Sequence, residues 1–380
     1  MLSAVPAPAA PRILILSHAC WEGLSRLPAM LHAAGASVEV FGPAGNYPSL
    51  SRYVSASHCA PAAMDAYLQA LKEFLAGAAP HDWIVIGDDT LWYALAAHRT
   101  QSWVQDVIQN AVPLTSLDMV VSKIHFSEKC IAAGIRMPAF RVCHNLAEAQ
   151  DAAAVLGFPL VLKEAQGYAG LSVQILHTPE SLAAADFSEP RIVQAFIRGK
   201  TLSACVLYQH GVLAGMFSYY RSRTWGSLGP SAAIRFKVFD GLTEMAQKLG
   251  QLSGFHGLCG LDLIESEEDG QWYLLEQNFR PTLTMDAGHL AGVDLTGLLP
   301  LLWSESSLPA NLPRLQNPAS GQLEALFPQD FFRAIDERRA LQIAGWLLRP
   351  WRWRWQEPAI MALNLRIALR KLMHRQHGAV

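Results

Sequence analysis

Short apolar runs alternate with longer amphipathic patterns over the first part of the chain. In order, they are residues 13–16 (strand), 24–34 (helix), 38–41 (strand), 64–75 (helix) and 83–86 (strand). A crossover helix between two strands lets them lie side by side in the same direction, so this rhythm predicts a parallel sheet covered by helices. We therefore expect a flexible leader over residues 1–11 and an α/β domain over residues 12–115.

Polar residues follow two of these strands. Ser17 and His18 come after the first, and Gly87, Asp88 and Asp89 come after the third. Ligands of such sheets bind beyond the carboxyl ends of the strands, which makes these residues candidates for a substrate pocket. An Asp at this position can equally cap the helix that begins near residue 90, and the sequence leaves both interpretations open. No G-x-G-x-x-G follows the first strand, so a dinucleotide-binding dehydrogenase is not indicated.

A second pattern covers residues 116–192 and contains two lysines. A helix over residues 117–133 carries Lys123, and a strand over 158–163 ends at Lys163. A loop with Gly167 and Gly170 follows, and then a second strand. A lysine at the entrance of a glycine-bearing loop between two strands can fold over a phosphate chain, as backbone N–H groups and an ammonium both favour anions.

The third region, residues 193–305, ends with two strands joined by an acidic turn, residues 257–265 and 271–277. Asp262 lies within the first strand, and Glu276 and Asn278 alternate on the second, so strand periodicity directs the last two to one face. Magnesium prefers such oxygen ligands. Arg280 continues the alternation and could hold a phosphate or carboxylate bidentately. A lone buried Asp can be a simple hydrogen-bonding residue, but burying this whole set without partners is costly, so we predict a metal and phosphate site.

The stretch from Lys123 to Asp286 resembles the ATP-grasp superfamily, and most of all its carbamoyl-phosphate-synthase-like and D-alanine–D-alanine-ligase-like members. The matching segments, in order, are Lys123 with Gly134 and Pro138, Lys163 with Gly167 and Gly170, the adenine hinge at 193–199, the basic loop at 221–231, and the magnesium motif at 260–262 and 275–280. The hinge departs from the family pattern at Gln194, where an acidic residue is usual, and Thr201 stands near the position of the acidic ribose ligand.

The resemblance implies a two-lobed ATP-grasp domain, with lobes at 116–192 and 193–305, that uses ATP and Mg²⁺, with Mn²⁺ as an alternative metal. A substrate carboxylate would attack the γ-phosphate, and an amine would capture the acyl phosphate. The implied nucleotide-binding residues are Lys123, Lys163, Gly167, Gly170, Gln194, Ala195, Ile197 and Thr201, with Arg235 or Lys237 as weaker candidates. The implied metal ligands are Asp262, Glu276 and Asn278, and the anchors for the acid are Arg280 and Arg223.

Alternatives remain for this assignment. The same domain serves kinases and carboxylases with acceptors other than amines, and a nucleotide-binding adaptor without catalysis is a further alternative. Arg223 could be a solvated loop cation. His18, His256 and His289 are more often structural than catalytic in such positions, and none is assigned a role. The sequence does not identify the acid or the amine, and a homodimer is left open.

The net charge of −2 gives no basic field for nucleic acid. The six cysteines are scattered, without metal-binding or disulfide spacing, which is typical of a reducing compartment. The apolar run at 13–16 is too short for a signal peptide or a membrane span, so we expect a cytoplasmic protein with small-molecule substrates.

The last region, residues 306–380, is predicted to be a basic, Trp-rich helical extension. From Leu341 to Val380 seven Arg or Lys stand against one Glu, a net charge of +6. Four tryptophans cluster with arginines before a helical stretch: Trp346, Trp351, Trp353 and Trp355. Residues 346–375 could therefore contact a membrane surface or a lipid-like ligand. The alternative, a terminal helix docked on the core, is favoured.

Overall fold

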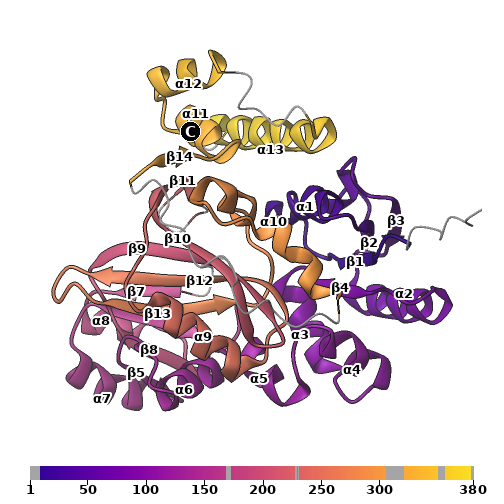
Figure 1. The fold of residues 1–380 in the computed structure, drawn as a ribbon. Coiled ribbons are helices and arrows are strands. Elements are labelled where there is room, and N and C mark those ends of the chain that lie inside the picture. The colour runs from indigo at the N-terminus through magenta and orange to yellow at the C-terminus, as the bar shows by residue number, and fades with distance from the viewer. Residues whose placement is uncertain are drawn as a thin grey trace, which may run out of the picture.

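The computed structural model describes residues 9–167, 173–226, 229, 231–304, 321–349 and 356–377. Within this part of the chain the strands form one parallel and two antiparallel sheets, with helices packed around them (Figure 1). The 3-10 helices are η1 (Glu22–Leu24), η2 (Pro48–Leu50), η3 (Leu114–Ser116), η4 (Met285–Ala291) and η5 (Leu299–Leu302). The mixed α/β fold predicted from the sequence is confirmed.

The N-terminal sheet is parallel, with strand order β3-β2-β1-β4. Its strands are β1 (Arg12–Leu16), β2 (Ser37–Pro43), β3 (Ala56–Ala60) and β4 (Trp83–Ile86). The neighbouring helices are α1 (Leu27–Ala33), α2 (Met64–Gly77), α3 (Asp89–Ala97) and α4 (Ser102–Gln109). Along β1, Ile13 and Ile15 pack into one apolar cluster while Leu14 and Leu16 pack into another, so both faces of the sheet are covered. Strand β3 was not predicted, because its exposed polar positions hide the pattern.

A small antiparallel sheet follows, with strand order β5-β8-β6-β7. Its strands are β5 (Phe140–Cys143), β6 (Leu160–Glu164), β7 (Val173–Leu176) and β8 (Arg191–Ala195). Its helices are α5 (Leu117–Val121), α6 (Lys123–Ala132), α7 (Leu146–Leu156) and α8 (Pro179–Ala183). The single helix expected over 117–133 is two, because Ser122 is extended and its side chain caps α6. The domain limits stay predictions, and the limit drawn at residues 192–193 falls inside β8.

The largest sheet has the strand order β13-β12-β9-β10-β11-β14 and is antiparallel. Its strands are β9 (Gly199–Gln209), β10 (Val212–Thr224), β11 (Ser231–Phe236), β12 (Gly257–Ser266), β13 (Trp272–Asn278) and β14 (Leu323–Ala325), and helix α9 (Leu242–Ser253) packs against it. The predicted pairing of the strands at 257–265 and 271–277 is confirmed. Helices of the N-terminal region share an apolar core with this sheet, which brings the two regions into contact.

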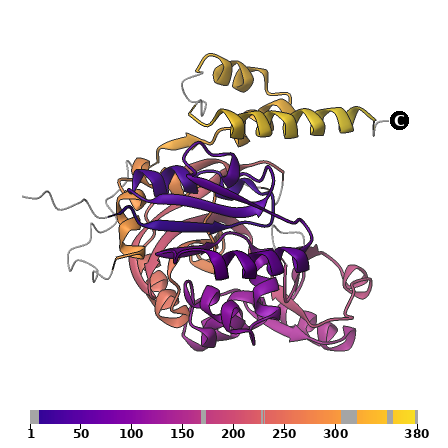
Figure 2. The same cartoon turned by 90° about the vertical axis from the view of Figure 1, so that its right-hand side faces the viewer.

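The C-terminal helices lie over the N-terminal sheet and the edge of the large sheet (Figure 2). They are α11 (Gln329–Asp336), α12 (Ala340–Leu347) and α13 (Pro358–His377), and the short α10 (Leu295–Leu298) precedes them. Helix α13 and the residue before it bind to the N-terminal region: Tyr47 donates to the Asn364 side chain at 2.6 Å, and Ser51 donates to Glu357, which directly precedes the helix, at 2.7 Å.

The tryptophans of the tail are only partly described. Trp346 is buried and donates its indole N–H to Asp330 at 3.0 Å. Trp351, Trp353 and Trp355 lie outside the described residues. Over the part of the chain that is described, no helix is both long and apolar enough to cross a membrane. The contacts of α13 agree with the favoured docked arrangement, and the alternative, a membrane contact through residues 346–375, gains no support from the described residues.

Candidate functional site

The strand pair β12–β13 brings three predicted metal ligands together. Asp262 lies directly opposite Glu276, and Asn278 lies opposite Gly260, two positions earlier on β12. The Asn278 amide donates to Asp262 at 3.1 Å, and Ser203 of β9 donates to the other oxygen of Asp262 at 2.7 Å. The pleat that places alternate side chains on one face is therefore the cause of this cluster.

Two lysines face the Glu276 carboxylate. Lys123, the first residue of α6, lies with its Nζ 3.8 Å from Glu276 Oε2. Lys163, near the end of β6, is removed from water, which lowers its pKa to about 8, and the Glu276 charge opposes that shift. Loss of hydration raises the pKa of the Glu276 carboxyl, although Lys123 acts in the opposite direction. Two cations thus lie near one carboxylate, and the negative charge of a bound phosphate chain would balance the excess positive charge.

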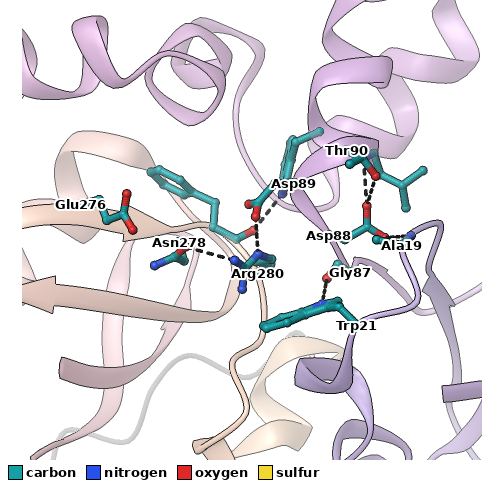
Figure 3. A network of polar contacts seen from close by, with 12 residues as sticks. Ala19, Trp21, Gly87, Asp88, Asp89, Thr90, Glu276, Asn278 and Arg280 are labelled. Atoms are coloured by element: carbon teal, nitrogen blue, oxygen red, sulfur yellow. Dashed lines mark hydrogen bonds and ion pairs between the residues drawn. The ribbon is translucent and has the colours of Figure 1, made fainter. Parts of the chain in front are cut away.

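Arg280 is fixed between β13 and the N-terminal region (Figure 3). Its Nε donates to Asp89 at 2.8 Å, and one Nη donates to the Asn278 side chain at 3.2 Å. The guanidinium lies over the Trp21 ring, 4.2 Å from the ring centroid, and the residue is buried. The sequence predicted that Arg280 belongs to the site, but not its partners Asp89 and Trp21.

The two neighbouring aspartates have different surroundings. Asp88 caps α3, accepting from the Leu91 N–H at 3.1 Å, and its other oxygen accepts from the backbone of His18 and Ala19. Asp88 is therefore a structural cap, as one of the two interpretations had it, and Asp89 is the one that reaches the Arg280 site. The His18 ring lies within hydrogen-bond distance of the Ala62 carbonyl, at 2.9 Å, which agrees with a structural role.

Arg223 lies in a different environment. It is near the end of β10 and forms an ion pair with Asp330 of α11, with 3.2 Å between Nε and the carboxylate oxygen. Asp330 is buried and also accepts from Arg333 and Trp346. Arg223 and Arg280 thus lie in separate ion pairs, and the role of Arg223 as an anchor for the acid stays a prediction.

The remaining predicted nucleotide-binding residues lie on the small sheet and on β9. Gln194 is buried on β8, and Ala195 closes that strand with its N–H bonded to the Ala139 carbonyl. Ile197 follows β8, and Thr201 lies on β9 opposite Ile264. Gly167 is described and Gly170 lies outside the described residues. Of the weaker candidates, Arg235 donates to the Gly321 carbonyl, and Lys237 donates to the Tyr220 hydroxyl at 2.9 Å.

One cavity connects several of these groups. Lys123, Gly167, Glu276 and Asn278 line it, together with Asp89 and Tyr93 of α3. Glu276 and Asn278 reach this cavity from the cluster that they form with Asp262, and two carboxylates and an amide suit a hard cation that takes its remaining ligands from a substrate. Among the described residues no three His, Cys, Asp or Glu side chains are grouped so as to hold a metal by themselves. The donor set thus fits magnesium bound jointly with phosphates rather than a metal held by protein alone.

Comparisons with known proteins point to one family. Residues 120–284 match the family model of the ATP-grasp domain. The carbamoyl phosphate synthase large chain of Neisseria meningitidis serogroup A is 25% identical over 189 residues, which cover 45% of this chain. The match spans only 17% of that relative's own length.

Solved structures give the same picture of the fold. An L-amino acid ligase from Bacillus licheniformis matches with a TM-score of 0.59 at 15% identity, covering 78% of this chain and 74% of its own. A biotin carboxylase from Campylobacter jejuni matches with a TM-score of 0.60 at 16% identity, covering 80% and 72%. At such identities the likeness concerns the fold alone.

Proposed function

Because residues 120–284 form an ATP-grasp domain, we propose that the chain is an ATP-dependent ligase that activates a carboxylate as an acyl phosphate for capture by an amine. ATP and Mg²⁺ are the cofactors in this proposal, with Mn²⁺ as the alternative metal. The observation that carries it is the cluster of Asp262, Glu276 and Asn278 facing Lys123 and Lys163, with Arg280 beside it.

The residues of the chain would act mainly by position and charge. Lys123 and Lys163 would bind the triphosphate, while Asp262, Glu276 and Asn278 would hold a magnesium ion. That ion would supply charge neutralisation to the phosphates. Phosphoryl transfer depends on such positioning and electrostatic stabilisation more than on a covalent protein group. The backbone around Gln194, Ala195 and Ile197 would bind adenine, Thr201 would approach the ribose, and the segment of Gly167 and Gly170 would lie over the phosphates.

The chemistry balances without a protein nucleophile. A carboxylate oxygen attacks the γ-phosphorus, the bond to the β-phosphate oxygen breaks, and ADP leaves. The amine nitrogen then attacks the acyl carbon, the carbon–oxygen bond breaks, and phosphate leaves as the amine loses a proton. Arg280 would hold the acid, because its guanidinium is fixed beside Asn278. Arg223 is the second candidate anchor, and its ion pair with Asp330 would have to open first.

One alternative has a specific observation behind it. A biotin carboxylase domain solved with MgADP and bicarbonate is among the structural neighbours, so bicarbonate is a candidate acid and a non-amine group a candidate acceptor. A non-catalytic adaptor is less favoured, because it would have no need of the lysine and carboxylate cluster. The cytoplasmic location and the homodimer stay predictions.

The test is ADP release from magnesium-ATP over a panel of amino acids, other carboxylates and bicarbonate, each with and without amines. The wild type is compared with Glu276→Gln and with Glu268→Gln, a matched control in the exposed turn between β12 and β13. ADP release that needs both an acid and an amine, and is lost only in Glu276→Gln, supports the ligase. Release that needs bicarbonate but no amine supports the carboxylase, and failure of the wild type to bind nucleotide contradicts both.

A further inference from the structure

One face of helix α3 touches the proposed ATP site at three points. Asp89, Trp92 and Tyr93 occupy positions i, i+3 and i+4, so they project from the same side of the helix. The helix belongs to the N-terminal region, where it follows β4 and is capped by Asp88. All three residues line the cavity that also contains Lys123 and Glu276.

Tyr93 holds the backbone of Gly167. The Gly167 N–H donates to the Tyr93 hydroxyl at 3.0 Å, and that hydroxyl lies 3.3 Å from the Gly167 carbonyl, to which it donates. Burial raises the pKa of Tyr93, so the hydroxyl keeps its proton and can serve as acceptor and donor at once. Gly167 has a φ of 144°, a conformation that glycine adopts without strain.

Asp89 and Trp92 hold the segment after β13. Asp89 accepts from Arg280 Nε, and the buried Trp92 indole donates to the Phe279 carbonyl at 2.9 Å. Phe279 stands between Asn278 and Arg280 in the chain, so these two contacts fix the backbone and the side chain of the same short segment. Figure 3 shows Asp89 above Arg280, with Trp21 on the opposite side of the guanidinium.

From this arrangement we propose that the face of α3 formed by Asp89, Trp92 and Tyr93 is a positioning surface that aligns the two halves of the site. Tyr93 sets the Gly167 backbone toward the nucleotide phosphates, and Asp89 sets Arg280 toward the acid. Neither touches the reacting atoms, so both are positioning residues. The inference rests on the proposed function for the roles of Arg280 and Gly167, and on geometry alone for the three contacts.

The experiment tests the Tyr93 contact and the Asp89 contact of this surface separately. Tyr93→Phe keeps the ring and removes only the hydroxyl, and we expect it to raise the KM for ATP about 10-fold with little change in the KM for the acid. Asp89→Asn is expected to raise the KM for the acid about 10-fold with the KM for ATP unchanged, and Asp89→Glu to restore part of that loss. The matched controls are Tyr273→Phe and Asp118→Asn, whose side chains form exposed contacts and do not line the cavity.

If the role is purely structural, each variant lowers the melting temperature and changes the KM for ATP and the KM for the acid together, or changes neither KM. Either result overturns the proposal. Direct calorimetric titration with magnesium-ATP keeps the test independent of turnover. If the wild type binds ATP but shows no acid-dependent ADP release, the ligase assignment fails, while weaker ATP binding by Tyr93→Phe still supports the positioning surface. If Tyr93→Phe binds ATP as the wild type does, the proposal fails even where the ligase assignment holds.

Discussion

Arg280 and Arg223 provide a comparison between two regions of the molecule. Each is paired with an aspartate from a distant part of the chain, Arg280 with Asp89 and Arg223 with Asp330. The Asp330 side chain is 4% exposed and is shared with Arg333 and Trp346, whereas the Asp89 side chain is 20% exposed and faces the cavity of Glu276. The buried network around Asp330 stabilises the fold. The pair of Arg280 and Asp89 borders a cavity, so a substrate can also compete for the arginine.

The largest expected effect is on catalysis, at Arg280. Arg280→Ala should lower kcat/KM for the acid by on the order of 100-fold or more, because it removes a fixed cation from the proposed substrate site. Steady-state kinetics on the acid identified by the ADP-release panel measure this. Arg223→Ala is the matched comparison, and we expect it to stay within roughly 5-fold of the wild type. An equal loss in the two variants would erase the distinction and make Arg223 a second anchor, as the sequence suggested.

The next effect is on stability, at Asp330. Asp330→Ala should lower the free energy of unfolding by about 3 kcal/mol, because it leaves the buried cation of Arg333 and the partly buried cation of Arg223 without their shared partner. Urea denaturation followed by circular dichroism measures the loss. Asp336→Ala on the same helix serves as a control with a smaller expected loss. A change below about 1 kcal/mol in Asp330→Ala would show that the network contributes little to stability.

A smaller effect concerns the pH dependence of nucleotide binding. The pKa of Lys163 is lowered to about 8 by loss of hydration, and bound phosphate would raise it again. Affinity for ATP should therefore be nearly full at about pH 7 and fall by on the order of 10-fold as the pH rises from 8 to 9.5, because the free protein loses a proton that the complex retains. The stability of the fold changes in the opposite direction. The folded state binds the Lys163 proton less tightly than the unfolded chain does, so the free energy of unfolding increases as the pH rises above 8.

Calorimetric titration of ATP at several pH values measures the affinity profile, with Lys163→Arg as the control. The guanidinium keeps its charge throughout this range, so the variant should show a flat profile above pH 8. A profile that falls equally in both proteins would assign the titration to another group.

The smallest expected effect concerns Trp225, the residue directly after β10. Its indole N–H donates to Asp336 at 3.0 Å, and its ring packs near Phe332 of α11. Trp225→Phe keeps an aromatic ring and loses the hydrogen bond, so we expect a loss of about 1 kcal/mol in the free energy of unfolding. Activity should change less than about 3-fold. A large loss of activity with unchanged melting temperature would assign this segment to the substrate site rather than to the contact with α11.

Much of the local structure could be predicted from the sequence. The period-two alternation of Glu276, Asn278 and Arg280, and the turn before them, predicted both the pairing with the Asp262 strand and the shared face. The sequence could not separate Asp88 from Asp89, because each stands three residues before a backbone N–H that it could cap. The structure shows that Asp88 caps α3 and that Asp89 reaches Arg280.

The long-range partners could not be predicted. Asp89 and Arg280 are separated by 191 residues, and Tyr93 and Gly167 by 74. Periodicity assigns a side chain to a face of its own helix or strand, but does not say which distant element packs on that face. The same limit applies to Arg223, because its ion-pair partner Asp330 lies in an extension whose packing the pattern of its residues does not reveal.

The central claim is that a carboxylate of the substrate is joined directly to the γ-phosphate of ATP. The most direct test is to supply the acid with ¹⁸O in its carboxylate, together with magnesium-ATP and the amine, and to follow the label by ³¹P NMR. The account predicts that one ¹⁸O atom per turnover appears in the released inorganic phosphate, with ADP unlabelled. Label in AMP, or acid-dependent ADP release with no label in phosphate, would contradict the acyl phosphate.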